Sequence, residues 1–170
     1  MLQRVVDRTA AAVDATWVIL GAHAAQLAPL AAQWPASVLL NPHWAQGIAS
    51  SIRVGVDHLP ASCDGVMLVL ADQALIGRED FRRLAHAWRR APDAIAAACH
   101  GAVLGAPAIF PRRGFTALRR LKGDTGARAL IAQHGAEVIA IPMPSAAFDL
   151  DTPEDLAAVT SAASLSGTSK

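Results

Sequence analysis

Short apolar runs alternate along this chain with longer amphipathic segments, and this alternation constrains the fold more than any other feature. Apolar runs of about four to eight residues are typical of β-strands, whereas apolar residues that recur every three or four positions are typical of helices. The runs interpreted as strands are 17–21, 38–41, 66–72, 94–99, 108–111 and 138–141, and the segments interpreted as helices lie near 2–14, 46–58, 79–90 and 125–134. Strands that alternate with helices predict an α/β fold with a mostly parallel sheet.

Residues 152–162 carry the start signals of a last helix. Thr152 can act as the N-cap, Pro153 occupies the first helical position, and the carboxylates that follow complement the helix dipole. No linker or internal repeat divides the chain, whose length suits one domain. We therefore expect a single domain over residues 1–160 and a flexible tail of small polar residues at 161–170.

The composition argues against several classes of protein. Apolar residues make up 53% of the chain, charged residues 17%, and the formal net charge is +1, which favours neither disorder nor a nucleic-acid binder. No apolar stretch approaches the roughly 18 residues of a membrane span, and the first residues do not resemble a signal peptide. Cys63 and Cys99 form no C-x-x-C pair, so structural zinc is not expected. We expect a cytoplasmic protein that binds neither nucleic acid nor a membrane.

The apolar run at 65–71 is followed directly by a carboxylate, Asp72. Such a run predicts a strand that is buried on both faces, as in a parallel sheet. Ligands of open α/β sheets bind beyond the carboxyl ends of the strands, so Asp72 stands where a metal or phosphate site would be built. The alternative is that Asp72 only caps a turn, and the residues alone do not decide between the two.

Three other segments have features of ligand-binding sites. Residues 41–53 run from an expected strand into an expected helix and offer backbone N–H groups, small hydroxyls and an arginine, although ordinary serine capping would look the same. Glycines at 101–107 allow a ligand to approach closely, and Arg128 follows a glycine-rich turn. Asp149 and Asp151, if extended, face the same side, although Asp151 could instead assist the N-cap. With Asp72 these carboxylates would offer the oxygen ligands that Mg²⁺ prefers.

Five motifs, in this order, resemble the molybdenum cofactor cytidylyltransferase-like group of nucleotidyltransferases, which attach a nucleotide to molybdopterin. The motifs are N-P-x-W-x-x-G-x-x-S-S-I-R at 41–53, L-V-L-A-D-Q at 68–73, G-x-P-A-I-F-P-R at 105–112, G-D-x-G-A-R at 123–128 and D-L-D-T-P-E-D-L at 149–156. The resemblance covers nearly the whole chain. It implies a Rossmann-like, three-layer α/β/α nucleotidyltransferase fold.

The resemblance also implies a role for each matching residue. Asp72 would be catalytic and bind Mg²⁺, with Asp149 or Asp151 completing the metal site or the pterin side. The residues expected against the nucleotide are Asn41, Gly47, Ser50, Ser51 and Arg53. The residues expected to face molybdopterin are Gly105, Pro107 and Arg128. The reaction implied is attack by the cofactor's terminal phosphate on the α-phosphate of CTP, with release of pyrophosphate and later transfer of the product to a molybdoenzyme or its chaperone.

One departure from the family pattern bears on activity. Members begin with a strand and a signature resembling L-A-A-G-x-S-x-R-M-G-x-x-K, which holds the triphosphate, whereas this sequence starts at the helix expected after it. Without that strand the apolar edges of its neighbours would be exposed, so we expect the protein to pair, rearrange or form a homodimer. We also expect little transfer activity from these 170 residues, because the cationic loop that stabilises the transition state would be missing.

Two other functions remain open at the level of sequence. One is a non-catalytic nucleotide- or pterin-binding relative that acts as an interaction or chaperone module. The other is a guanylyl- or sugar-nucleotide transferase of the same fold that uses Asp72. CTP and GTP readers share this scaffold and differ in small loop contacts, so the sequence does not settle the base.

Overall fold

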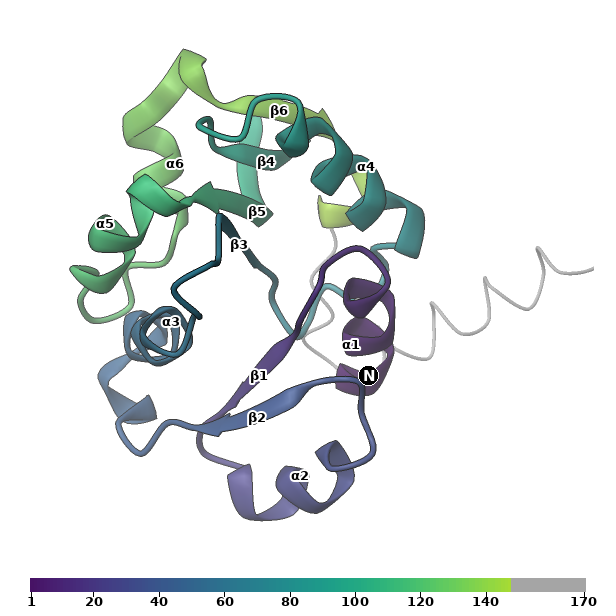
Figure 1. The fold of residues 1–170 in the computed structure, drawn as a ribbon, viewed down its shortest axis with the longest axis vertical. Helices are drawn as coiled ribbons and strands as arrows, with labels where there is room; N and C mark the ends of the chain where they lie inside the picture. Colours follow the sequence, from purple (N-terminus) through teal and green to yellow (C-terminus); the bar gives the residue numbers. More distant parts are fainter. Residues whose placement is uncertain (148–170) are drawn as a thin grey trace, which may run out of the picture.

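The computed structural model describes residues 1–147 of the chain (Figure 1). Its helices are α1 Leu2–Ala10, α2 Ala24–Ala31, α3 Ile48–Asp57, α4 Arg78–Arg89, α5 Phe115–Arg119 and α6 Arg128–His134. Its strands are β1 Trp17–Leu20, β2 Ser37–Leu40, β3 Gly65–Leu68, β4 Ala96–His100, β5 Val103–Pro111 and β6 Ile139–Pro142. Its 3₁₀ turns are η1 Trp44–Gln46, η2 Arg112–Gly114, η3 Gly135–Glu137 and η4 Pro144–Ala147. The expected helix at 152–162, Asp149 and Asp151 lie outside the described residues.

The strands form two groups rather than one mostly parallel sheet, so that prediction was wrong. β1 and β2 pair in parallel, with Trp17 opposite Ser37, while the other strands form a four-stranded sheet in the order β3-β5-β4-β6. In that sheet β5 is antiparallel to both of its neighbours, and β4 pairs with β6 in parallel. The reason is the tight turn after β4, where Gly101 has a φ of 57° and sends the chain straight back as β5.

β3 differs most from its predicted form. The expected strand at 66–72 was to be buried on both faces, but β3 ends at Leu68 and its residues are only half buried. Among the described strands it pairs with β5 alone, so it lies at an edge of its sheet. Asp72 therefore lies in a turn beyond the strand, where its carbonyl accepts a hydrogen bond from the Ala74 N–H at 2.8 Å.

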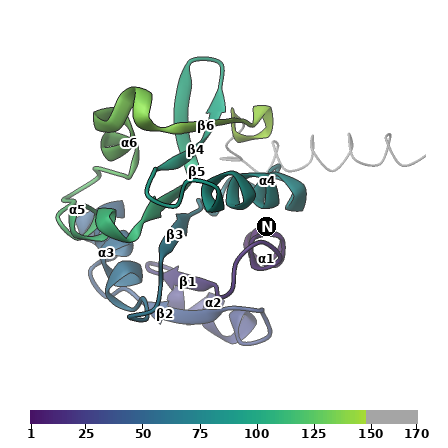
Figure 2. The same cartoon turned by 45° about the horizontal axis from the view of Figure 1, so that its top comes forward.

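Helices cover both faces of the four-stranded sheet, which confirms the three-layer expectation for this part of the molecule (Figures 1 and 2). Ala97 of β4 packs in the core with α3, α5 and α6, whereas its neighbours Ala96 and Ala98 pack in the core with α4. Successive strand residues point to opposite faces, so one short alanine run serves both cores. Aromatic side chains fill the space above these small residues, Phe110 and Phe115 on one face and Phe81 on the other.

Candidate functional site

Asn41 ties the end of β2 to the start of α3. Its side chain is 2% exposed, and its Nδ2 donates to Ser50 Oγ at 2.8 Å and to Ser51 Oγ at 3.0 Å. Its Oδ1 accepts from the His43 N–H at 2.9 Å, and Ser50 Oγ donates to the Gly47 carbonyl at 2.8 Å. Because these polar groups satisfy one another, Asn41 and Ser50 set the shape of the loop. Ser51, which is half buried, also lines the large cavity described below.

The loop at 122–127 packs against the start of α3, so two motifs that are far apart in the sequence lie together. The Ala49 N–H donates to the Gly123 carbonyl at 3.1 Å. Gly47 has a φ of 91°, and a Cβ there would overlap the Gly123 backbone and the Asp124 carboxylate. The Arg53 guanidinium donates at 2.6 Å to the carbonyl of Leu121, the residue that precedes this loop, and so fastens α3 to the start of the loop. Gly47 and Arg53 thus hold the two loops in contact.

Gln73 connects the turn that carries Asp72 to β5. Its side chain is 3% exposed; Nε2 donates to the Ala106 carbonyl at 2.8 Å, and Oε1 accepts from the Leu70 N–H at 3.4 Å. The accepting carbonyl belongs to a bulge, because the register of β4 against β5 passes from Ala108 to Gly105 and leaves residues 106 and 107 unpaired. Bulges re-aim the chain and are frequent beside functional sites.

Of the two predicted residues here, Gly105 borders this bulge and Pro107 lies within it; both belong to β5 rather than to a free loop, and Pro107 is fully buried. Gln73 received no role from the sequence. The feature of the sequence that could have indicated a role is its amide, a polar group next to Asp72 in an otherwise apolar motif. It fixes the Asp72 turn relative to the bulge.

Asp72 is the one expected metal ligand in the described part of the chain. It is half buried, and no group of three or more His, Cys, Asp and Glu side chains arranged to hold a metal occurs within residues 1–147. Mg²⁺ commonly binds through one or two carboxylates together with substrate phosphates and waters. The donor set of the described residues therefore fits a divalent cation held mainly by a nucleotide, and does not fit a closed protein cage.

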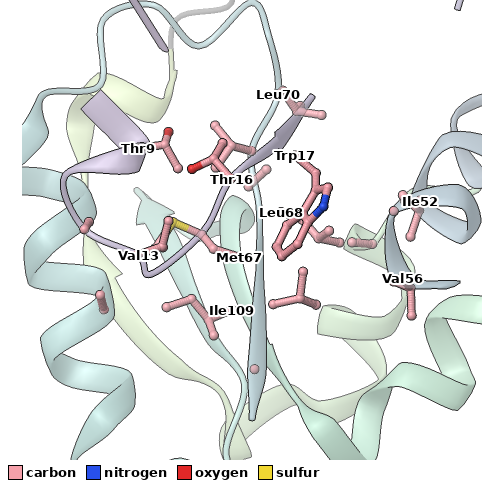
Figure 3. Close-up of a pocket in the computed structure, with 18 of the residues that line it drawn as sticks. Thr9, Val13, Thr16, Trp17, Ile52, Val56, Met67, Leu68, Leu70 and Ile109 are labelled. Atoms are coloured by element: carbon pink, nitrogen blue, oxygen red, sulfur yellow. The ribbon is translucent and has the colours of Figure 1, made fainter. Parts of the chain in front are cut away.

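A cavity of about 1200 Å³ lies between the β1–β2 pair and the four-stranded sheet (Figure 3). Its wall includes Ser51, Gly105 and Arg128 together with Gln73. Arg128, the first residue of α6, is exposed, and its side chain makes no hydrogen bond or ion pair with other described residues. The cavity thus brings one predicted residue from each of three separate motifs to one place.

Cys63 lines the same cavity. Burial raises the pKa of its thiol, and its Sγ–H donates to the Gly65 carbonyl at 3.2 Å. A thiol with a raised pKa stays protonated at neutral pH and is a poor nucleophile. The chemistry of this cavity therefore depends on its hydroxyl, amide and guanidinium groups.

The match to a known family decides how this geometry is interpreted. Residues 1–138 match the MobA-like NTP transferase domain. The chain belongs to this family. No curated protein matches the sequence. The resemblance inferred from the motifs is therefore confirmed for MobA-like nucleotidyltransferases as a whole. Within residues 1–147, no helix of the MobA-like domain is both long and apolar enough to cross a membrane.

Several solved structures share the fold of this chain. The structure of Rv0371c from Mycobacterium tuberculosis is 24% identical with a TM-score of 0.75, covering 94% of this chain and 83% of that chain. A nucleotidyl transferase from Methanothermobacter thermautotroptrophicus is 15% identical with a TM-score of 0.77, covering 95% and 79%. The molybdopterin-guanine dinucleotide biosynthesis protein A from Archaeoglobus fulgidus is 15% identical with a TM-score of 0.58, covering 86% and 78%. Rv0371c has also been solved in complex with manganese.

Proposed function

We propose that this MobA-like nucleotidyltransferase transfers CMP from CTP to molybdopterin and releases pyrophosphate. The observation that carries the proposal is the convergence of Ser51, Gly105 and Arg128 on one cavity beside the turn held by Gln73. We place the reaction in the cytoplasm, in one domain over residues 1–160, and expect a molybdoenzyme or its chaperone to receive the product.

In this proposal, the loop at 41–53 binds the nucleotide. Asn41 and Ser50 hold the loop in shape, since their polar groups bond to each other at 2.8 Å, while Gly47 lets the neighbouring loop pack closely. The Ser51 hydroxyl is the group of this loop that both lines the cavity and can still donate a hydrogen bond. A hydroxyl can recognise the polar edge of a base or a ribose.

In this proposal, Arg128 binds the phosphate of molybdopterin. A guanidinium binds phosphate through two parallel N–H groups, and that of Arg128 is not engaged by other residues of the described chain. Gly105 lines the same cavity and leaves open space there, because a Cβ at this position would meet no atom within 4 Å. A bound Mg²⁺ would neutralise phosphate charge, and Asp72, with Asp149 or Asp151, would hold it.

The binding test compares nucleotides by thermal unfolding of the whole chain. A ligand that binds only the folded state raises the unfolding temperature, so CTP with Mg²⁺ should raise it more than GTP with Mg²⁺. Equal shifts with both nucleotides contradict the cytidylyl assignment, and larger shifts with GTP favour a guanylyl transferase. Release of pyrophosphate in the presence of molybdopterin separates a transferase from a binding module.

The metal assignment is tested with Asp72→Asn. This change removes the charge but keeps the shape, so we expect the Mg²⁺-dependent part of the thermal shift to disappear. Asp93→Asn is the matched control, because Asp93 also lines the cavity but is exposed and belongs to none of the five motifs. A Mg²⁺-dependent shift that survives in Asp72→Asn shows that the ion is held elsewhere.

A further inference from the structure

The segment that carries Asp72 is a loop between β3, which ends at Leu68, and α4, which begins at Arg78. Loops are in general more mobile than the elements that they connect. A metal ligand, in contrast, acts well only when its supporting residues hold it at a defined place. Gln73 holds this loop to β5 through the Ala106 carbonyl. The other contacts of the loop therefore bear on how firmly Asp72 is placed.

α1, which packs beside α4, is a second element that holds this loop (Figures 1 and 2). The Arg8 Nη1 atom donates to the Ala74 carbonyl at 2.7 Å and to the Ile76 carbonyl at 2.9 Å. Val5 lies three residues before Arg8, on the same face of α1. It packs with Ala74 and Val69 in a small core cluster. α1 thus contacts the loop through one apolar and one cationic side chain.

The hydrogen bonds of Arg8 lead to the residue that holds Asp72. The Ala74 N–H donates to the Asp72 carbonyl at 2.8 Å, while the Ala74 carbonyl accepts from Arg8. Both backbone groups of Ala74 are therefore engaged, one by Asp72 and the other by Arg8. Ile76, the second acceptor, is 1% exposed and packs in the core with Phe81 of α4. One guanidinium nitrogen thus links the turn of Asp72 to a residue that is anchored in the core.

The surroundings of Arg8 do not favour a cation by themselves. Arg8 is half buried, and this burial, together with the guanidiniums of Arg4 and Arg78, lowers its pKa. None of the ion pairs within residues 1–147 includes Arg8. A partly buried charge needs hydrogen bonds to compensate for lost solvation, and those of Arg8 go to the two carbonyls of the loop. The stabilisation of this cation therefore depends on the loop that carries Asp72.

We propose that Arg8 is a positioning residue, which places the Asp72 carboxylate for a divalent cation. The proposal rests on the proposed function, in which Asp72 holds that cation. Arg8 acts on the cation through Ala74 and Asp72, and it does not need to touch the cation or the nucleotide. Residues that orient a metal ligand typically change metal affinity by about 10–100-fold when they are replaced. The proposal therefore predicts an effect on metal binding in addition to any effect on stability.

The test uses Mn²⁺ with CTP, added to the whole chain without molybdopterin so that no transfer takes place. Mn²⁺ broadens the amide NMR signals of nearby residues, and the concentration that half-broadens the signals of residues 71–74 measures binding to the folded protein. We expect this concentration to rise about tenfold in Arg8→Met. Arg4→Met is the matched control and should leave the concentration unchanged. Arg4 lies on the same helix, but its side chain is exposed and bonds to no other described residue.

Two further comparisons separate positioning from other effects. In the double variant Arg8→Met, Asp72→Asn, the loss of Arg8 should cause no further rise beyond that of Asp72→Asn alone, because Arg8 acts through Asp72. Arg8→Lys keeps a charged donor on α1, so it should lose less Mn²⁺ binding than Arg8→Met. Arg8→Lys also supplies the same comparison if Arg8→Met does not fold.

Each other outcome overturns the proposal. If Arg8→Met lowers the stability in urea but leaves Mn²⁺ binding unchanged, the role of Arg8 is structural alone. Equal rises in Arg4→Met and Arg8→Met show that the charge of α1 matters and the bonds to the loop do not. A further rise in the double variant shows that Arg8 acts elsewhere than through Asp72.

Failure of the proposed function gives a different result from failure of the positioning role. If the parent shows no broadening at residues 71–74, or if Asp72→Asn binds Mn²⁺ as well as the parent does, the assignment of the metal to Asp72 is wrong and the role of Arg8 fails with it. If Asp72→Asn weakens Mn²⁺ binding and Arg8→Met does not, the metal assignment stands and only the role of Arg8 is overturned.

Discussion

Gly47 shows how a single residue can decide whether two loops meet. Its φ of 91° disfavours any side chain, and a Cβ would overlap the Gly123 backbone. We expect Gly47→Ala to lower the free energy of unfolding in urea by about 2 kcal/mol or more, because strain and overlap add. Gly105→Ala is the control, since its added methyl meets no atom within 4 Å, and a similar loss in both variants contradicts the account.

Gln73 is the second residue whose role is testable. Gln73→Leu leaves the Ala106 carbonyl and the Leu70 N–H without the side-chain partners they have at 2.8 Å and 3.4 Å. Buried groups that lose their partners cost about 1–3 kcal/mol each, so we expect a loss of at least about 1 kcal/mol in urea unfolding. Gln46→Leu removes an amide of the same kind at an exposed position and should change the stability little. Equal losses would show that Gln73 does not connect the turn to the bulge.

Residue types at motif positions could be recognised from the sequence, but the partners of their polar groups could not. Asn41 and Arg53 were predicted to contact the nucleotide, and in the structure their donors bond to Ser50 Oγ and to the Leu121 carbonyl. A hydroxyl, amide or guanidinium uses the same donors for a ligand and for a neighbouring loop. Only the three-dimensional arrangement leaves Arg128 unengaged within the described chain and places it on a cavity wall.

At the scale of elements, Asp80 fastens the start of α4 to the segment after β6. Its Oδ2 accepts from the Gly77 N–H at 3.0 Å and from Ser145 Oγ at 3.2 Å, and its Oδ1 accepts from Arg83 at 2.7 Å. Burial raises the pKa of Asp80, but the hydrogen bonds from Arg83, Gly77 and Ser145 outweigh it and the pKa is lowered overall. The Asp80 carboxylate therefore binds a proton less tightly in the folded state than in the unfolded state.

The lowered pKa gives a prediction with a defined sign. The stabilisation by ionised Asp80 is present above the unfolded pKa of about 3.9 and is lost as the pH falls through the lower folded pKa. We expect Asp80→Asn to cost about 1 kcal/mol of unfolding free energy at pH 7, and the difference from the parent to shrink below about pH 4. Glu79→Gln is the control, because the exposed Glu79–Arg82 pair at 3.7 Å contributes little. A cost that stays constant with pH contradicts the role of the charge.

The positions of the strands were predictable, because each apolar run within residues 1–147 became a strand. The parallel or antiparallel pairing of the strands was less predictable. Residues 101–107 were interpreted, from their glycines, as a segment between two strands that a ligand can approach closely, but Gly101 makes a tight turn and β5 already begins at Val103. α2 was not expected, since Pro29 lies inside it and its alanines show no polar face. Pairing direction depends on turn geometry and bulges, which short apolar patterns do not encode.

At the scale of the molecule, the two groups of strands differ in how well they are supported. Ala97 of β4 and Ala108 of β5 are 0% exposed and lie between strands on both sides, with helices above and below. Among the described strands β2 has one neighbour, and its last residue, Leu40, is 62% exposed. A two-stranded pair is only marginally stable by itself and depends here on α1, α2 and the contacts of α3 with β1.

This difference predicts the order in which the unmodified chain opens. Segments with few buried contacts open with a smaller free energy than the core, so the amides of β1 and β2 should exchange with solvent faster than those of β4 and β5. The measurement is native-state hydrogen exchange with increasing urea, in which β4 and β5 should exchange only on global unfolding while β1 and β2 exchange through a smaller opening. If both groups share one exchange free energy, the cavity does not separate them energetically, and the molecule unfolds as one cooperative unit despite its divided sheet.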